Sequence, residues 1–177
     1  MSFMGAGLIL LSADGGSTLL VHDTRSGKWG FPKGHREAID ANEIATATRE
    51  CFEETGLTPD DYFIHADAFK ISKGSQSYLF HYAIMKEGSR TQLRKGPVHE
   101  IAGIAWVPLM SLFGAETVLD GNKYLRTWIE DVKAGLTKKS VSIFKGLLAR
   151  FAAGGGAAAG SKPFQESVGS ANIVACS

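Results

Sequence analysis

Apolar runs separated by turn-forming residues predict two β-hairpins in the first half of the chain. Residues 7–11 and 18–21 are apolar and flank an Asp-Gly-Gly turn sequence at 14–16. Residues 62–71 and 77–85 are rich in aromatic and β-branched side chains and flank a Lys-Gly-Ser sequence. Each pair of runs therefore has the pattern of antiparallel strands joined by a short connection.

The apolar positions change to a helical period over residues 41–55, which predicts an α-helix there. Asp40 and Glu43 suit a capping box at its start, and Gly56 suits its C-terminal end. The expected core face of this helix carries mostly small side chains at helical spacing, namely Ile44, Ala47, Thr48, Cys51 and Thr55.

The second half of the chain predicts one further strand and two helices. Residues 101–107 read as a strand, 123–133 as an amphipathic helix and 141–151 as a weaker helix. Glycine and alanine dominate the sequence soon afterwards, so we expect one domain over residues 1–152 and a flexible tail over 153–177. The irregular mixture of hairpins and helices predicts an α+β or mixed-sheet α/β domain.

Composition places the chain among soluble globular proteins, with 44% hydrophobic and 21% charged residues in a length of 177. The net charge of +1 provides no strong overall field toward nucleic acid or an acidic membrane. Cys51 and Cys176 are too few for a disulfide framework, and the first apolar run is too short for a membrane span. We therefore expect a cytoplasmic protein with no membrane partner, and the sequence does not indicate an oligomeric state.

A group of carboxylates near the end of the first predicted helix is the strongest chemical signal. Glu50, Glu53 and Glu54 lie three and four positions apart, so one helix face carries all of them, roughly opposite the expected core face. Their mutual repulsion costs roughly 0.2–0.5 kcal/mol per pair, and the helix dipole disfavours acids at this end. Arg49 pairs with only one of them at helical spacing. A bound Mg²⁺ would relieve the repulsion, because it prefers carboxylate oxygens.

The loop before this helix has the composition of a phosphate-contacting segment. Residues 27–35 contain three glycines and a proline, and Gly34 permits a close backbone approach to a metal or phosphate. Lys33, His35 and Arg36 are positioned to neutralise phosphate oxygens. Taken singly, each of these basic residues also fits an ordinary solvated loop position.

Residues 34–57 resemble the Nudix box, a loop–helix–loop motif. Its usual form is Gly, five residues, Glu, seven residues, then Arg-Glu-apolar-x-Glu-Glu-x-Gly-apolar. Residues 49–57 read Arg-Glu-Cys-Phe-Glu-Glu-Thr-Gly-Leu and match the second half at every defined position when Cys51 counts as apolar. Glu100 followed by Trp-Val-Pro at 106–108 is similar to the last strand of such domains. The resemblance covers residues of about 5–133.

The first half of the box departs from the usual form. Asp40 stands six residues after Gly34, where the motif has Glu. The interval from Gly34 to Arg49 is also one residue longer than usual, and we place the extra residue between Glu37 and Asn42. These departures leave open whether Asp40 replaces the usual glutamate or only caps the helix.

The resemblance implies an α/β/α sandwich with a mixed sheet and a magnesium-dependent pyrophosphohydrolase, with manganese as a possible substitute. It implies that Glu50, Glu54 and the carbonyl of Gly34 hold the metal. Glu53 would complete the metal site or act as the base, and Glu100 is similar to a second carboxylate that serves as base or metal ligand in some members. These assignments agree with phosphoanhydride chemistry, in which metal ions neutralise phosphate charge and a carboxylate accepts the proton.

By the same resemblance Arg49 orients the glutamates, while Lys33, His35 and Arg36 contact substrate phosphates. The sequence Trp-Gly-Phe-Pro-Lys-Gly at 29–34 is similar to the box entries of diadenosine tetraphosphate hydrolases and mRNA-decapping Nudix enzymes. Some diphosphoinositol polyphosphate phosphohydrolases share its Phe-Pro-Lys-Gly part.

The favoured substrate is therefore a dinucleoside polyphosphate such as diadenosine tetraphosphate. Capped RNA and diphosphoinositol polyphosphates are the alternatives, and a non-catalytic nucleotide-binding module is the least favoured interpretation. Aromatic side chains with the shape to stack on a base, although core packing is favoured for each, are Trp29, Phe31, Tyr78 and Tyr82.

Overall fold

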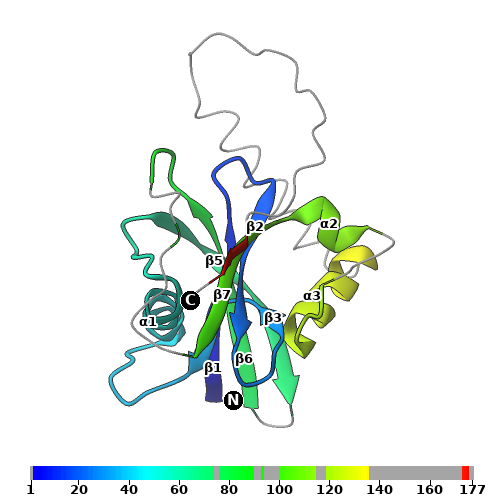
Figure 1. Cartoon of the computed structure of the whole chain (residues 1–177). Helices are drawn as coiled ribbons and strands as arrows, with labels where there is room; N and C mark the ends of the chain where they lie inside the picture. The colour runs from blue at the N-terminus through cyan, green and yellow to red at the C-terminus, as the bar shows by residue number, and fades with distance from the viewer. Residues whose placement is uncertain are drawn as a thin grey trace.

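A mixed β-sheet lies at the centre of the molecule, with helices on both of its faces (Figure 1). The computed structural model describes residues 2–73, 76–89, 93, 100–114, 119–135 and 173–175. The strands are β1 (Ser2–Leu11), β2 (Ser17–Asp23), β3 (Trp29–Gly30), β4 (Lys33–His35), β5 (Tyr62–Lys73), β6 (Gln76–Met85), β7 (Ile101–Pro108) and β8 (Ile173–Ala175). The helices are α1 (Glu43–Thr55), α2 (Leu109–Phe113) and α3 (Lys123–Lys133).

The strand order is β5-β6-β1-β2-β7-β8, with β3 paired to β2 and β4 paired to β1. Among the paired strands of the described residues, β1 and β6 run parallel and the other pairs run antiparallel, so the sheet is mixed. The other edge of β1 is divided: Gly5 to Gly7 pair with β4, and Leu11 pairs with Thr18 of β2. This division places β4 beside the centre of the sheet.

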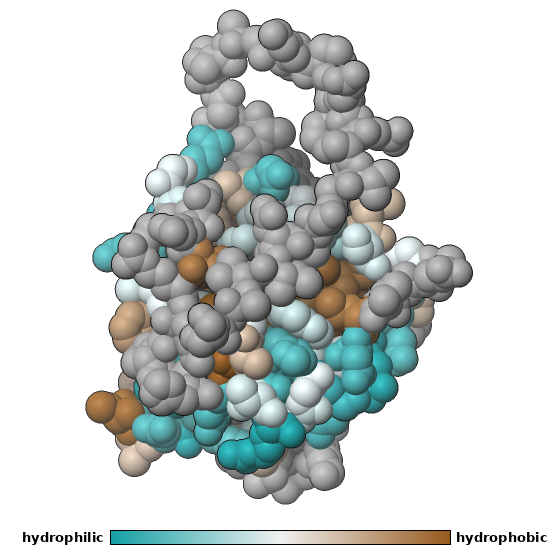
Figure 2. Space-filling model, viewed as in Figure 1, coloured by the Kyte–Doolittle hydropathy of each residue, from teal (hydrophilic) through white to brown (hydrophobic). Residues whose placement is uncertain are grey.

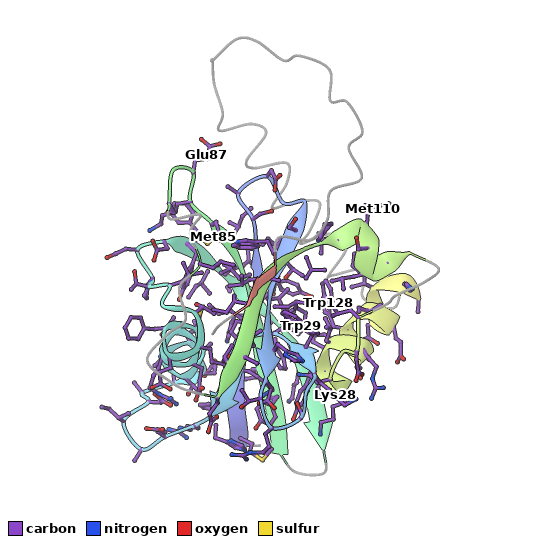
Figure 3. The ribbon with its side chains drawn as sticks, in the orientation of Figure 1. Lys28, Trp29, Met85, Glu87, Met110 and Trp128 are labelled. Carbon is purple, nitrogen blue, oxygen red and sulfur yellow. The ribbon has the colours of Figure 1, made fainter. Side chains whose placement is uncertain are left out.

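Side chains of alternating direction from the central strands fill two cores, one on each face of the sheet. In β1, Leu8 and Leu10 pack toward α1, whereas Ile9 and Leu11 pack toward α2 and α3. Because helices cover both faces, β1 reads as a nearly continuous apolar run. Trp128 of α3 is fully buried in the second core, and Figure 3 shows it beside Trp29, between the sheet and α3.

Helix α1 begins two residues later than the sequence predicts, because Asn42 is its N-cap and accepts a hydrogen bond from the backbone N–H of Ala45. Its C-terminal cap is Gly56, as expected, with a φ of 71°. Ile44 was expected in the core but is 38% exposed, whereas Thr46 is buried. The Thr46 hydroxyl donates to the Asp40 carboxylate, which turns that side of the first helical turn inward.

The prediction that the acidic face of α1 lies opposite the core face is wrong. Residues three apart on a helix are separated by only about 60° in projection, so Glu54 lies beside Cys51 rather than across from it. The structure accordingly leaves Glu50 and Glu54 only partly exposed. The acids therefore border the core, and this position determines their electrostatics.

The remaining differences from the sequence analysis concern short elements. Strands β3 and β4 lie within the expected loop, and the expectation of a flexible tail over 153–177 did not include β8, which pairs with β7. The predicted helix at 141–151 and the other tail residues lie outside the described residues. Within the part of the chain that the structure describes, no helix has the length and apolar character needed to cross a membrane.

Candidate active site

Strand β4 lies against the C-terminal half of α1, and Gly34 makes room for the Glu50 carboxylate where they meet. A Cβ atom built on Gly34 would lie 2.0 Å from the carboxyl carbon of Glu50, closer than two such atoms can approach. One residue earlier, the backbone N–H of Lys33 donates to Oε2 of Glu54 at 3.1 Å. The box entry and two of the three glutamates thus form one packed unit.

Arg49 connects the segments that surround these acids. Its Nη1 lies 2.9 Å from Oε1 of Glu50 and 3.2 Å from Oε2 of Glu53. Its Nη2 donates to the carbonyl oxygen of His35 at 2.9 Å, which attaches β4 to the helix. Nε and Nη2 both donate to the carboxylate of Asp40, at 3.1 and 2.9 Å. One guanidinium therefore fixes both the helix acids and the loop that precedes them.

Asp40 is a buried anchor for Arg49 rather than the cap of α1. Its side chain also accepts from the Thr46 hydroxyl and from the backbone N–H of Glu37, each at 2.9 Å. The hydrogen bonds from the Arg49 guanidinium hold the pKa of Asp40 well below its usual range. The carboxylate is therefore ionised throughout the neutral range and holds Arg49 in place by two contacts.

The two glutamates nearest β4 lie in an environment that disfavours their charged forms. Burial raises the pKa of Glu54 to about 8, although the nearby Lys33 side chain opposes this shift. Burial also raises the pKa of Glu50 above its ordinary value, although Arg49 opposes the shift. The positive charge that the protein itself supplies is thus insufficient for these carboxylates, which is the condition that a bound cation relieves.

A pocket of about 460 Å³ opens in front of these acids. The turn between β2 and β3 lies toward the bottom of the view in Figure 1, and the same end of the molecule is mainly hydrophilic in Figure 2. The pocket is lined by Asp23, Arg25, Lys33, Gly34, His35, Glu37, Glu50, Glu53, Glu54 and Glu100. All but two of the site residues predicted from the sequence line it.

The two exceptions are Arg49 and Arg36. Arg49 lies behind the acids and contacts them directly. Arg36 does not line the pocket: its guanidinium carbon lies 4.8 Å from the ring centroid of Phe3, so the expected phosphate contact has no support in the structure. The sequence analysis missed Asp23 and Arg25, because only the pairing of β2 with β7 brings their turn to the glutamates, and no local motif records that pairing.

An aromatic and cationic surface adjoins Lys33 and His35. The Lys33 ammonium lies 5.8 Å from the ring centroid of Tyr124, and the Lys123 ammonium lies 4.8 Å from it. The Tyr124 ring is 5.0 Å from that of Tyr78, whose hydroxyl lies 2.9 Å from Nε2 of His35. Of the aromatic residues singled out from the sequence, Phe31, Tyr78 and Tyr82 are buried core residues, and Trp29 packs partly buried against the same core.

The donor set fits a magnesium ion that shares its ligands with a substrate. Among the residues that the structure describes, no three acidic, histidine or cysteine side chains converge as a preformed metal cage. Mg²⁺ usually takes only one or two carboxylates and fills its remaining positions with water and substrate phosphates. The carboxylates of Glu50 and Glu54, which line the pocket beside Gly34, meet that requirement.

Comparison with known proteins agrees with this geometry. The family model described as the NUDIX domain matches residues 1–131. The putative hydrolase 111R of Invertebrate iridescent virus 3 is 32% identical over 98 residues, which are 55% of this chain and 56% of that protein. The chain thus matches about half the length of that relative.

Solved structures show the same fold. A binary complex of the Ap4A hydrolase of C. elegans has a TM-score of 0.59 and 21% identity, covering 76% of this chain and 98% of that chain. The NUDIX domain of Shewanella oneidensis NrtR, solved with ADP ribose, has a TM-score of 0.57 and 18% identity, covering 77% and 90%.

These findings define the class of the protein as an α/β domain with a mixed sheet and the fold of these solved Nudix structures. The chain belongs to the Nudix family. Enzymes of this family generally use a divalent metal.

Proposed function

We propose that this chain is a magnesium-dependent pyrophosphohydrolase that cleaves a phosphoanhydride bond in a dinucleoside polyphosphate such as diadenosine tetraphosphate. The observation that carries the proposal is the pair Glu50 and Glu54, which lie partly buried in a pocket that is lined by four further carboxylates. A protein that only bound a polyanion would gain nothing from mutually repelling carboxylates in its pocket.

The roles of the individual residues follow from their positions. Glu50 and Glu54, with the carbonyl of Gly34, hold the metal, for which Mn²⁺ can substitute. The metal, when bound, neutralises phosphate charge and lowers the pKa of a coordinated water. Glu53 and Glu100 line the same pocket and are the candidate proton acceptors.

Positioning is the task of Arg49, which contacts Glu50 and Glu53 and is itself held by Asp40. This arrangement keeps the carboxylates in place before substrate arrives, so little reorganisation is needed during the reaction. Lys33 and His35 line the pocket beside β4 and contact substrate phosphates.

A nucleotide substrate is supported by the surface next to Lys33 and His35. Tyr124 is partly buried against the core, and the Lys33 and Lys123 ammonium groups lie 5.8 and 4.8 Å from its ring centroid, so an aromatic side chain and two cations adjoin here, as a nucleotide with its phosphates would need. A long polyphosphate chain then extends from this surface across the pocket toward Glu100.

ADP-ribose is the second candidate, because a solved domain of the same fold carries it. It has two phosphates rather than four, so the two candidates differ in how much of the pocket they fill. Capped RNA and diphosphoinositol polyphosphates are the further alternatives that the sequence raised.

A hydrolysis screen with magnesium separates these candidates. We expect the highest kcat/KM on diadenosine tetraphosphate, with products identified by mass, when it is compared with ADP-ribose, capped RNA, a diphosphoinositol phosphate and nucleoside triphosphates. Chelation is expected to abolish hydrolysis, and magnesium is expected to restore it. Full activity in excess chelator would contradict the metal assignment, and a preference for another substrate would contradict the substrate assignment.

A further inference from the structure

The turn between β2 and β3 brings a second cation to the rim of the pocket. Asp23 and Arg25 both line the pocket, although neither belongs to the box. The turn is closed by its own backbone, because Asp23 N–H donates to the Lys28 carbonyl at 3.0 Å and the Ser26 N–H donates to Oδ1 of Asp23 at 2.6 Å. The backbone of Arg25 is therefore fixed, while its side chain is 88% exposed.

Thr24 fastens this turn to the start of β7. Its backbone N–H and its hydroxyl both donate to the carbonyl of Glu100, at 2.8 and 2.9 Å. This double contact aligns the next residue, Arg25, with the Glu100 side chain. Their charged groups lie 3.8 Å apart at the rim.

The ion pair between Arg25 and Glu100 is weak and easily exchanged. Both side chains are mostly exposed, at 88% and 67%, and a distance of 3.8 Å is too long for a hydrogen bond. Exposed pairs of this kind contribute little to stability. An arginine that binds a phosphate through two parallel hydrogen bonds makes a shorter and stronger contact.

A phosphate that enters this acidic pocket can be contacted by few cationic side chains of the protein. Among the described lining residues, Lys33 and Arg25 are the lysine and arginine side chains, against six carboxylates. The Lys33 ammonium lies toward Tyr124 on α3. Of the lining residues that the structure describes, Arg25 is therefore the arginine or lysine on the side of β2 and β7.

We propose that Arg25 gives up its ion pair with Glu100 to bind the phosphate of a long polyphosphate chain that lies farthest from the glutamates of α1, and that this contact selects polyphosphates over diphosphates. The inference rests on the proposed function, because it names the residue that contacts the distant part of the polyphosphate chain of the same substrate. When a phosphate at the rim takes the place of Glu100 beside Arg25, the Glu100 carboxylate is free to act as a proton acceptor near the reacting phosphate. A diphosphate that reaches from the glutamates toward Lys33 does not extend to Arg25.

The test compares Arg25→Ala and Arg25→Lys with Lys28→Ala. Lys28 lies on the same turn, but its ammonium pairs with Asp120 at 3.0 Å and does not line the pocket, so its removal controls for net charge. Figure 3 shows Lys28 near the lower end of α3. KM is measured for diadenosine tetraphosphate and for ADP-ribose with magnesium. The dissociation constant of inorganic tripolyphosphate in magnesium buffer is measured by calorimetry.

For Arg25→Ala we expect KM for the tetraphosphate and the tripolyphosphate dissociation constant to rise roughly 10- to 100-fold, with a much smaller rise in KM for ADP-ribose. The lysine variant should recover part of the loss, and Lys28→Ala should stay near wild type. Equal changes for both substrates, equal changes in Arg25→Ala and Lys28→Ala, or unchanged tripolyphosphate binding would overturn the inference. If the wild type hydrolyses neither substrate, the proposed function is wrong, but this result does not test Arg25. The calorimetry with tripolyphosphate then decides whether Arg25 binds phosphate.

Discussion

Replacing Glu54 with glutamine should damage turnover while stabilising the metal-free fold. Glutamine keeps the size of the side chain and a carbonyl oxygen that can accept the hydrogen bond from the backbone N–H of Lys33. It cannot ionise, so the cost of a partly buried carboxylate disappears together with a metal ligand. The two measured quantities therefore change in opposite directions.

The magnitude follows from the pKa of Glu54. Burial raises it from 4.5 to about 8, so folding disfavours ionisation of this group. When folding raises the pKa of an acid, the folded state is favoured in full at pH values below the unfolded-state pKa. That part of the free energy of unfolding is lost as the pH rises through the folded-state pKa. At pH 7 the loss is roughly 3 kcal/mol, at about 1.4 kcal/mol per pKa unit. The stabilisation by Glu54→Gln should therefore be up to roughly 3 kcal/mol at pH 7 and clearly smaller at pH 5.

The assay needs both readouts on the same samples. Urea unfolding in chelator at pH 5 and 7 gives the free energy of unfolding, and turnover is measured with saturating magnesium. We expect turnover to fall by roughly two or more orders of magnitude, because catalysis at such a site is mainly electrostatic. Glu43→Gln is the control on the same helix, where an acid in the first turn is mildly favourable and its loss costs roughly 0.3–1 kcal/mol. Near-normal turnover of the Glu54 variant, or a loss of stability at pH 7, would refute the reasoning.

Three further predictions concern the supporting structure. Asp40→Asn should lower the free energy of unfolding by roughly 1–3 kcal/mol at pH 7 through the weakened contact to Arg49. Because folding lowers the pKa of Asp40 from 3.8, the stabilisation by its carboxylate is present above pH 3.8 and is lost as the pH falls toward the folded-state pKa. Urea unfolding should therefore show that the stability difference between the variant and the wild type shrinks below about pH 4. A difference that stays constant with pH would argue against this reasoning. Gly34→Ala should weaken magnesium activation by roughly 10- to 100-fold, because its Cβ displaces the Glu50 carboxylate; an unchanged magnesium dependence of the rate would rule this out. A chain ending after residue 152 should keep its turnover and lose only a few degrees of Tm, since among described contacts only β8 is removed from β7; a lost turnover would contradict the expected tail of 153–177.

The sequence predicts most of the fold because local patterns carry it. The apolar run of β2, the aromatic strands β5 and β6, and the amphipathic period of α3 lie close to where the sequence places them, whereas β1 begins at Ser2, well before the predicted run at 7–11. Short elements were missed for a physical reason. Strand β4 owes its conformation to pairing with β1, and the exposure of Ile44 depends on the contact between Thr46 and Asp40.

The same division holds for the site. The sequence spacing identifies the glutamates and Gly34 as site residues, because all of them lie on one helix and on the segment directly before it. Arg49 was expected to pair with one acid at helical spacing, but its contact with Asp40 and with the carbonyl of His35 depends on how that loop folds back. Arg25 reaches the site only through the sheet, so no neighbouring residue in the sequence reveals it.

The divided edge of β1 has a consequence for how this protein can change in length. Strand β4 is registered on Gly5 to Gly7, and β2 is registered on Leu11 of the same strand. One residue inserted between these pairings would shift Lys33 to His35 by one place against the hairpin, and the side chains beyond the insertion would change faces. Insertions in the surface turns have no such effect. The spacing of the catalytic groups is thus set by a stretch of glycine and aliphatic residues that has no reactive group of its own.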